Sequence, residues 1–222
     1  LYETGVADIV WDKDLVPVEL MDVLVKRPDF HSFAYLGTYF YRFNVTKPPF
    51  DNPKVRQAMA YAMPYQKIMD AVLFALANPM FGAAADKATE VAWPQPTKYS
   101  TDMAKAKALL AEAGYANGFE TTISFDLNFA GVNEPLCILV QESLAQIGIK
   151  TTINKVPGAN WRTELNKKEM PLYTNVFSGW LDYPEYFFYW CYHGKNSNFN
   201  TMSYQSKAMD AMIDGAVDAA AI

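Results

Sequence analysis

The residues best suited to chemistry stand together between positions 177 and 184. The sequence there reads Phe-Ser-Gly-Trp-Leu-Asp-Tyr-Pro, so an apolar run meets a glycine and then presents Trp180, Asp182 and Tyr183 within four residues. Strand ends of α/β sheets border ligand crevices, where an indole, a carboxylate and a phenol would suit binding. A buried Trp180 beside a solvated Asp182 in a tight turn fits the same spacing. Both interpretations stay open on spacing alone.

Signals of catalysis are few. The chain has two histidines, His31 and His193, and neither has a carboxylate at metal-ligand spacing, so each is expected to be a surface or loop residue. No Gly-x-Gly-x-x-Gly or phosphate loop occurs, and Ser178-Gly179-Trp180 lacks the flanking glycine of a nucleophile elbow. The sequence therefore disfavours an enzyme and predicts no cofactor.

Composition narrows the class further. Net charge is −5 with no basic run, which excludes the footprint of a nucleic-acid-binding protein. The longest charge-free stretch, 71–85, is shorter than the roughly 20 apolar residues that cross a bilayer. Leu1 is followed by Tyr-Glu-Thr-Gly, which is no signal-peptide pattern and predicts that the natural N-terminus lies upstream. Cys137 and Cys191 are expected to be buried thiols, with a disulfide left open.

Strands and helices alternate along the chain. Alternation predicts strands at 35–45, 122–127 and 149–153, and an apolar strand follows at 172–177. The strand at 122–127 is expected to be half-buried, with Ile123, Phe125 and Leu127 on its inner face. Helical spacing predicts helices at 53–63, after Pro64, and at 103–113, 136–147, 161–168 and 209–220, while 78–100 is predicted to be a long loop. The order predicts an α/β layer architecture with a mixed central sheet flanked by helices.

Four blocks in this order resemble one family, the oligopeptide- and dipeptide-binding receptors of ABC importers (extracellular solute-binding proteins of family 5). They are Tyr35–Tyr39 with Lys47–Ala58, Ala104–Tyr115, Leu144–Lys150, and Gly179-Trp180 with Asp182-Tyr183-Pro184 followed by Asn200, Tyr204 and Asp210. The resemblance implies the type II periplasmic-binding fold, in which two lobes close on a peptide. It implies that residues 33–222 form one lobe and that residues 1–32 are a connecting segment of the other lobe.

The resemblance also implies ligand-binding residues. Trp161 and Trp180 match tryptophans that line side-chain pockets, so both are expected to edge the cleft and to be partly exposed. Asp182 matches the acid that pairs with the peptide's α-ammonium, although one residue fewer separates it from Trp180 than peptide receptors show. Lys168 matches a basic residue that meets a carboxylate end. Phe177 stands at another basic position, and Tyr183 and Tyr186 are expected at the cleft rim.

The leading hypothesis is therefore a substrate-binding lobe that captures oligopeptides outside the cytoplasm and delivers them to a membrane-embedded permease. The expected fragment is monomeric and binds no nucleic acid or metal. One alternative is the same receptor fold adapted to haem, nickel, murein peptide or another solute, which the aromatic run 186–193 raises. That run is more simply explained by packing. Another alternative is a sensor or interaction module without transport.

Overall fold

The structure, a computed structural model, describes residues 23, 26–27, 37–73, 99–178 and 184–220. Contacts divide the chain into residues 1–33 and residues 34–222. Within the first unit the backbone N–H of Lys26 donates to the carbonyl of Val23 at 3.3 Å. The assignment of residues 1–32 to a second lobe stays a prediction.

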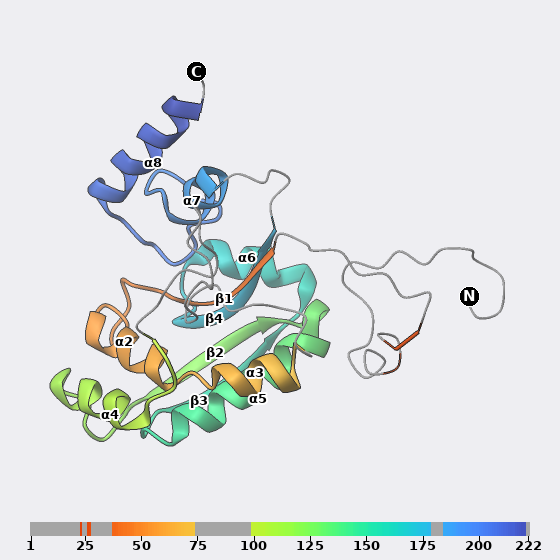
Figure 1. Ribbon diagram of the computed structural model, residues 1–222, viewed down its shortest axis with the longest axis vertical. Coiled ribbons are helices and arrows are strands. Elements are labelled where there is room, and N and C mark those ends of the chain that lie inside the picture. The colour runs from red at the N-terminus through yellow and green to blue at the C-terminus, as the bar shows by residue number, and fades with distance from the viewer. Residues whose placement is uncertain (1–22, 24–25, 28–36, 74–98, 179–183, 221–222) are drawn as a thin grey trace. The chain divides into compact units, whose positions relative to one another are not determined.

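Four strands form one mixed sheet in residues 34–222 (Figure 1). The order is β1-β4-β2-β3, and the strands are β1 (Gly37–Phe43), β2 (Glu120–Asp126), β3 (Lys150–Val156) and β4 (Leu172–Ser178). β1 runs antiparallel to β4, whereas β2 is parallel to both β4 and β3. Parallel neighbours require crossover connections, which the helices α5 (Ala130–Ala145) and α6 (Gly158–Lys167) supply. The predicted mixed α/β architecture is confirmed.

The helices begin and end only in part at residues that the sequence marks, since the helix predicted from residue 136 begins at Ala130 and has no side-chain N-cap. They are α2 (Pro53–Ala62), α3 (Tyr65–Ala71), α4 (Met103–Glu112), α5 (Ala130–Ala145), α6 (Gly158–Lys167), α7 (Pro184–Tyr192) and α8 (Lys207–Ala220), with a 3₁₀ turn, η1, at Leu127–Phe129. The side chain of Asp102 accepts a hydrogen bond from the N–H of Lys105 at 2.9 Å, as expected of an N-cap. Gly114 and Gly148 follow α4 and α5 with φ of 88° and 85°. The sequence pattern did not predict α7.

One face of the sheet carries the main core. Alternate residues of the strands, among them Tyr41, Ile123 and Leu172, pack with apolar side chains of α2, α4 and α5. Figure 1 shows α6 and α7 on the other side of the sheet. There Tyr173 packs with Val156 of β3 and with side chains of α6 in a second, smaller cluster. Successive side chains of each strand point to opposite faces of the sheet, so alternate residues belong to the main core and to the smaller cluster.

β2 differs from its predicted pattern. Ser124 and Asp126, expected to face solvent, are buried because β2 is an interior strand with structure on both faces. Ser124 Oγ accepts a hydrogen bond from Asn154 Nδ2 at 3.2 Å, which satisfies the buried hydroxyl. The prediction that Leu127 extends the buried face is wrong, since the strand ends at Asp126 and Leu127 lies exposed in η1.

Candidate functional site

The parallel strands β2 and β3 end level with each other, Asp126 opposite Val156. Asp126 Oδ1 accepts a hydrogen bond from the N–H of Asn128 at 2.9 Å, which turns the chain as it leaves β2. The Asn128 side chain then lies so close to Gly158 that a Cβ on Gly158 would stand 2.0 Å from Asn128 Nδ2. Glycine at the start of α6 thus lets the loops after β2 and β3 touch. Ligand crevices of α/β sheets form outside such strand ends.

Trp161 lies in the first part of α6 and faces the sheet. Its side chain packs against Val156, Leu165 and Tyr173, and it meets the Tyr173 ring edge-on with centroids 6.2 Å apart. Only 7% of Trp161 is exposed. The expectation that Trp161 is partly exposed is therefore wrong, because α6 presses the indole onto β4.

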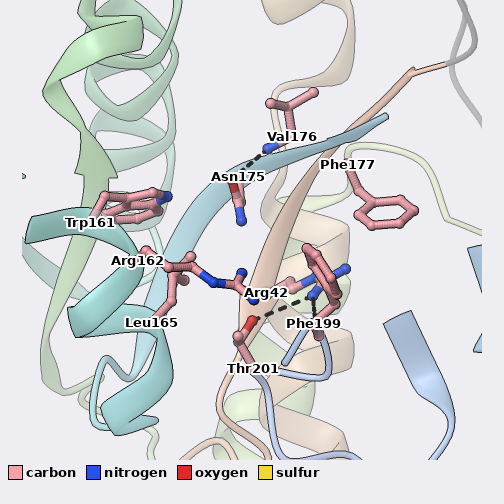
Figure 2. Close-up of a pocket in the computed structure, with 9 residues that line it drawn as sticks. All are labelled: Arg42, Trp161, Arg162, Leu165, Asn175, Val176, Phe177, Phe199 and Thr201. Atoms are coloured by element: carbon pink, nitrogen blue, oxygen red, sulfur yellow. Dashed lines mark hydrogen bonds between the residues drawn. The ribbon is translucent and has the colours of Figure 1, made fainter. Parts of the chain in front are cut away.

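A hollow of about 160 Å³ opens beside Trp161 on this face of the sheet (Figure 2). We call it the α6 hollow. Side chains from β1, β4, α6 and the segment before α8 line it: Arg42, Trp161, Arg162, Leu165, Asn175, Val176, Phe177, Phe199 and Thr201. Sites for drug-sized ligands typically measure about 300–1,000 Å³. The α6 hollow is thus the size of a pocket for one group of a larger ligand.

Arg42, on β1, lines the α6 hollow and hydrogen-bonds the segment at 199–201. It stands directly across from Tyr173 in the antiparallel β1–β4 pair, and its side chain is buried. Arg42 Nη1 donates to the carbonyl of Phe199 at 2.5 Å and to Thr201 Oγ1 at 3.4 Å. The Tyr173 hydroxyl also hydrogen-bonds Thr201 Oγ1. Burial raises the pKa of Tyr173, and the positive charge of Arg42 opposes that rise.

Arg162, on α6, contacts the same segment at Asn198 and Phe199. Its side chain extends from α6, and Nη2 donates to the carbonyl of Asn198 at 2.7 Å. Its guanidinium carbon lies 4.5 Å from the centroid of the Phe199 ring, a cation–π distance. Two guanidinium groups therefore fix residues 198–201 against β1, β4 and α6 and border one hollow.

The thiols and the imidazole of the described residues are buried. Cys137 and Cys191 are buried free thiols, and burial raises the pKa of the Cys137 thiol to about 12, so it stays protonated at neutral pH. His193, expected to be a surface or loop residue, lies in the loop after α7 and is buried, and its Nε2 lies 3.1 Å from Asp214 Oδ1 on α8. Among the described residues no His, Cys, Asp and Glu side chains gather as a metal site. In the same part of the chain no helix is long and apolar enough to span a membrane.

Comparison with known proteins decides the family. The sequence model of the bacterial extracellular solute-binding proteins, family 5 (middle region), matches residues 1–199. The chain belongs to this family.

Curated family 5 relatives extend beyond the chain. The glutathione-binding protein GsiB of Salmonella choleraesuis (strain SC-B67) is 30% identical over 98% of this chain and 43% of the relative. The periplasmic oligopeptide-binding protein OppA of Escherichia coli (strain K12) is 30% identical over 96% of this chain and 40% of its own length. The chain thus spans about two fifths of these relatives. Proteins of this kind are transport binding proteins.

Solved structures show the type II periplasmic-binding fold. DppA of Helicobacter pylori, solved in complex with peptide STSA, superposes with a TM-score of 0.76 at 24% identity over 90% of this chain and 40% of that one. The dipeptide-binding protein of Pseudoalteromonas sp. SM9913, solved with Met-Leu, gives a TM-score of 0.75 at 24% identity over 90% of this chain and 41% of that one. The predicted fold is confirmed.

The structure places two of the five predicted binding residues. Trp161 lines the α6 hollow. Lys168 ends α6 in the left-handed conformation, with φ of 55°, and its carbonyl accepts a hydrogen bond from Asn44 Nδ2 at 2.5 Å. At 1.5 Å per helical residue it lies roughly 10 Å along α6 from Trp161, and it does not line the hollow. Trp180, Asp182 and Tyr183 lie outside the described residues.

The position that carries a basic anchor in peptide receptors also contributes to the hollow. Phe177 stands there and lines the hollow, and its ring contacts Tyr186 with centroids 6.0 Å apart. It also meets Phe187 and Phe199 edge-on. The aromatic run of α7 thus packs onto the sheet through Phe177.

Five polar or aromatic residues of the hollow were not predicted from the sequence. They are Arg42, Arg162, Asn175, Phe199 and Thr201. Two carry a signal in hindsight, since Arg42 is the only charge in the strand Gly37–Phe43 and Asn175 interrupts the apolar end of β4. Phe199 and Thr201 reach the hollow only through folding of a segment without regular structure, and no local pattern marks them.

Proposed function

We propose that this chain is a lobe of a substrate-binding protein that captures oligopeptides and delivers them to the membrane-embedded permease of an ABC importer. The observation that carries the proposal is the family 5 match over residues 1–199. Support comes from OppA, named as oligopeptide-binding, and GsiB, named as glutathione-binding, each 30% identical over nearly the whole chain. A receptor of this kind works outside the cytoplasm and performs no catalysis.

The alternatives receive less support. The relatives named above are a glutathione-binding and an oligopeptide-binding protein. Their names support neither a receptor for haem, nickel or murein peptide nor a sensor without transport. The aromatic run of α7 packs on Phe177, Phe199 and its own neighbours, which explains it without a cofactor. We propose a monomeric receptor with no affinity for nucleic acid, in keeping with a net charge of −5.

The proposed ligand contacts follow from the family resemblance and the fold. Trp161 and Trp180 form walls for peptide side chains, Asp182 pairs with the α-ammonium, Lys168 faces a carboxylate end, and Tyr183 stands at the rim. Extended-peptide recognition draws affinity from main-chain hydrogen bonds and fixed termini, while wide pockets tolerate varied side chains. Asp182 follows the carboxyl end of β4, where such a terminus would lie.

The first prediction tests Asp182 in the full-length receptor. Asp182→Asn and N-acetylation of the peptide should each weaken binding by about 2–5 kcal/mol, because each leaves one member of a buried charge pair without its partner. The two losses should not add, since both remove the same pair. Titration calorimetry with a tripeptide and its N-acetyl form on both proteins measures all four affinities.

Asp218→Asn serves as the matched control, because it removes the same charge from an exposed position on α8. Unchanged peptide affinity in Asp182→Asn, together with a lower melting temperature, would make Asp182 a turn residue and place the anchor elsewhere. Native mass spectrometry of the unmodified receptor tests the function itself. Co-purification of haem or a metal in place of peptide would contradict it.

A further inference from the structure

His193 is a buried imidazole outside the proposed ligand contacts. It lies in the loop between α7 and α8, and 1% of it is exposed. The N–H of Lys195 donates to Nδ1 at 3.1 Å, so the ring proton is on Nε2. Nε2 lies 3.1 Å from Asp214 Oδ1, and the N–H of Gly194 donates to Asp210 Oδ1 at 2.9 Å. Two carboxylates one helical turn apart thus hold the start of this loop to α8.

The carbonyl of His193 continues these contacts into the loop. It accepts hydrogen bonds from the N–H of Asn196 at 3.0 Å and from Asn200 Nδ2 at 3.3 Å. Asn196 Oδ1 in turn accepts a hydrogen bond from the N–H of Phe199 at 3.2 Å. Both asparagines are buried, and Asn200 directly precedes Thr201. Two hydrogen bonds therefore connect His193 to the backbone of Phe199.

The far end of this loop forms a wall of the α6 hollow. Phe199 and Thr201 line the hollow, and Figure 2 shows both beside Arg42. Arg42 Nη1 donates to the carbonyl of Phe199 and to Thr201 Oγ1, which binds this end of the loop to β1. The N–H of Phe199 is bonded instead to Asn196, on the side of the loop that His193 holds. The place of the Phe199 ring in the wall thus depends on both sets of contacts.

We propose that His193 is a positioning residue for the wall of the α6 hollow. Asp210 and Asp214 hold it from α8, and through Asn196 it sets where the Phe199 ring stands. The inference rests on the proposed function, under which this wall meets the peptide. His193, Asp210 and Asp214 do not line the hollow, so they act on a ligand only through the loop.

The test removes the Asp214 carboxylate from the full-length receptor. Asp214→Ala leaves the Nε2 proton of His193 without its acceptor, and it opens no cavity in the core because the Asp214 side chain is 55% exposed. Amide hydrogen exchange across residues 194–201, measured by mass spectrometry, should quicken roughly 2- to 10-fold, the usual worth of one hydrogen bond. Asp214→Asn keeps an acceptor oxygen and should restore slow exchange.

A second measurement separates positioning from stability. Titration calorimetry gives the affinity for tri-alanine and for its analogues with one Phe at each position. In Asp214→Ala at least one of these affinities should fall by the same factor as the exchange rates rise, and Asp214→Asn should restore it. A role in stability alone would leave every affinity unchanged, because the receptor stays folded at the temperature of the measurement.

Asp218→Ala is the matched control, because it removes a carboxylate from an exposed position one turn further along α8. It should change neither exchange nor affinity. Asp210→Ala removes the acceptor of the Gly194 N–H and should act as Asp214→Ala does. This variant decides the question if Asp214→Ala does not fold.

Three results would overturn the inference. In the first, exchange across residues 194–201 is the same in Asp214→Ala and Asp218→Ala. In the second, exchange quickens in Asp214→Ala while every peptide affinity stays unchanged. Both leave the proposed peptide-binding function intact. In the third, the unmodified receptor binds none of these peptides, which overturns the proposed function as well.

Discussion

At the scale of single residues, Trp161 connects the second core cluster to the α6 hollow. Its indole rests on Tyr173, whose hydroxyl bonds Thr201, and Thr201 in turn accepts a hydrogen bond from Arg42. These contacts join α6, β4, β1 and the segment at 199–201. A buried tryptophan at such a junction has two tasks, because it supports packing while one edge borders the hollow.

Removal of the indole should therefore cost stability as well as binding. We predict that Trp161→Ala lowers the free energy of unfolding by about 3–5 kcal/mol, the usual cost of deleting a buried tryptophan side chain. Urea unfolding of the full-length receptor, followed by circular dichroism, measures the loss. Phe188→Ala is the control, because Phe188 is 37% exposed and should cost much less. A loss below about 1 kcal/mol in Trp161→Ala would show that the indole is not part of the core.

Single residues were predictable only in part. The family resemblance marks Trp161, but its burial depends on how α6 docks on β4, which no local pattern specifies. Arg42 lines the hollow because β1 pairs with β4, which places Arg42 opposite Tyr173. The two strands are far apart in the sequence, so this pairing could not be read from a local pattern. Arg162 has no distinguishing signal, since a charged residue on a short helix is usually solvated. The hollow could not be assembled before the sheet order was known.

At the scale of elements, the loops that enter β2 and β3 lie against each other. Gly118 and Gly148 precede the two strands, with φ of 75° and 85°. The N–H of Lys150 donates to the carbonyl of Phe119 at 2.9 Å, which begins the parallel β2–β3 pair. A Cβ on Gly118 would stand 1.9 Å from the carbonyl oxygen of Gly148. An added Cβ would therefore overlap backbone atoms of Gly148, which cannot move aside as the end of a flexible side chain could.

This junction gives a prediction for Gly118. We expect Gly118→Ala to lower the free energy of unfolding by at least about 3 kcal/mol, because the left-handed backbone and the overlap with Gly148 both penalise a Cβ. Gly131→Ala is the matched control, since Gly131 lies within α5 and an added Cβ meets no atom within 4 Å. It should gain about 0.5–1 kcal/mol. Urea unfolding of both variants makes the comparison, and equal effects would contradict it.

The elements themselves were largely visible in the sequence. An N-cap and a glycine stop located α4, a glycine stop located the end of α5, and alternation located the strands, because these signals are local. The start of α5 at Ala130, six residues before the predicted start at 136, has no side-chain cap that could mark it. The solvent face assigned to β2 was wrong, since only the full sheet order reveals that β2 is an interior strand. α7 escaped prediction because its aromatic residues favour strands as much as helices, and packing on Phe177 decides the outcome.

At the scale of the whole molecule, the α6 hollow is small beside a peptide. The chain spans about two fifths of its curated relatives, and ligand sites bury about 70–90% of a bound molecule. A hollow of about 160 Å³ with one open side buries a single group. Under the proposed function a second lobe supplies the opposite wall, and closure between the lobes would withdraw the peptide from water.

The same reasoning predicts how the 222-residue chain behaves without a second lobe. Its core packs the sheet against α2, α4 and α5, so we expect cooperative thermal unfolding. Peptide at a concentration that saturates the full-length receptor should not shift the transition, because a ligand stabilises the folded state only where its concentration approaches or exceeds its Kd. The full-length receptor is the control, and there a concentration of about 100 times Kd should add about 2.7 kcal/mol. A micromolar peptide affinity for the 222-residue chain by calorimetry would show that one wall suffices, and the need for closure would then be wrong.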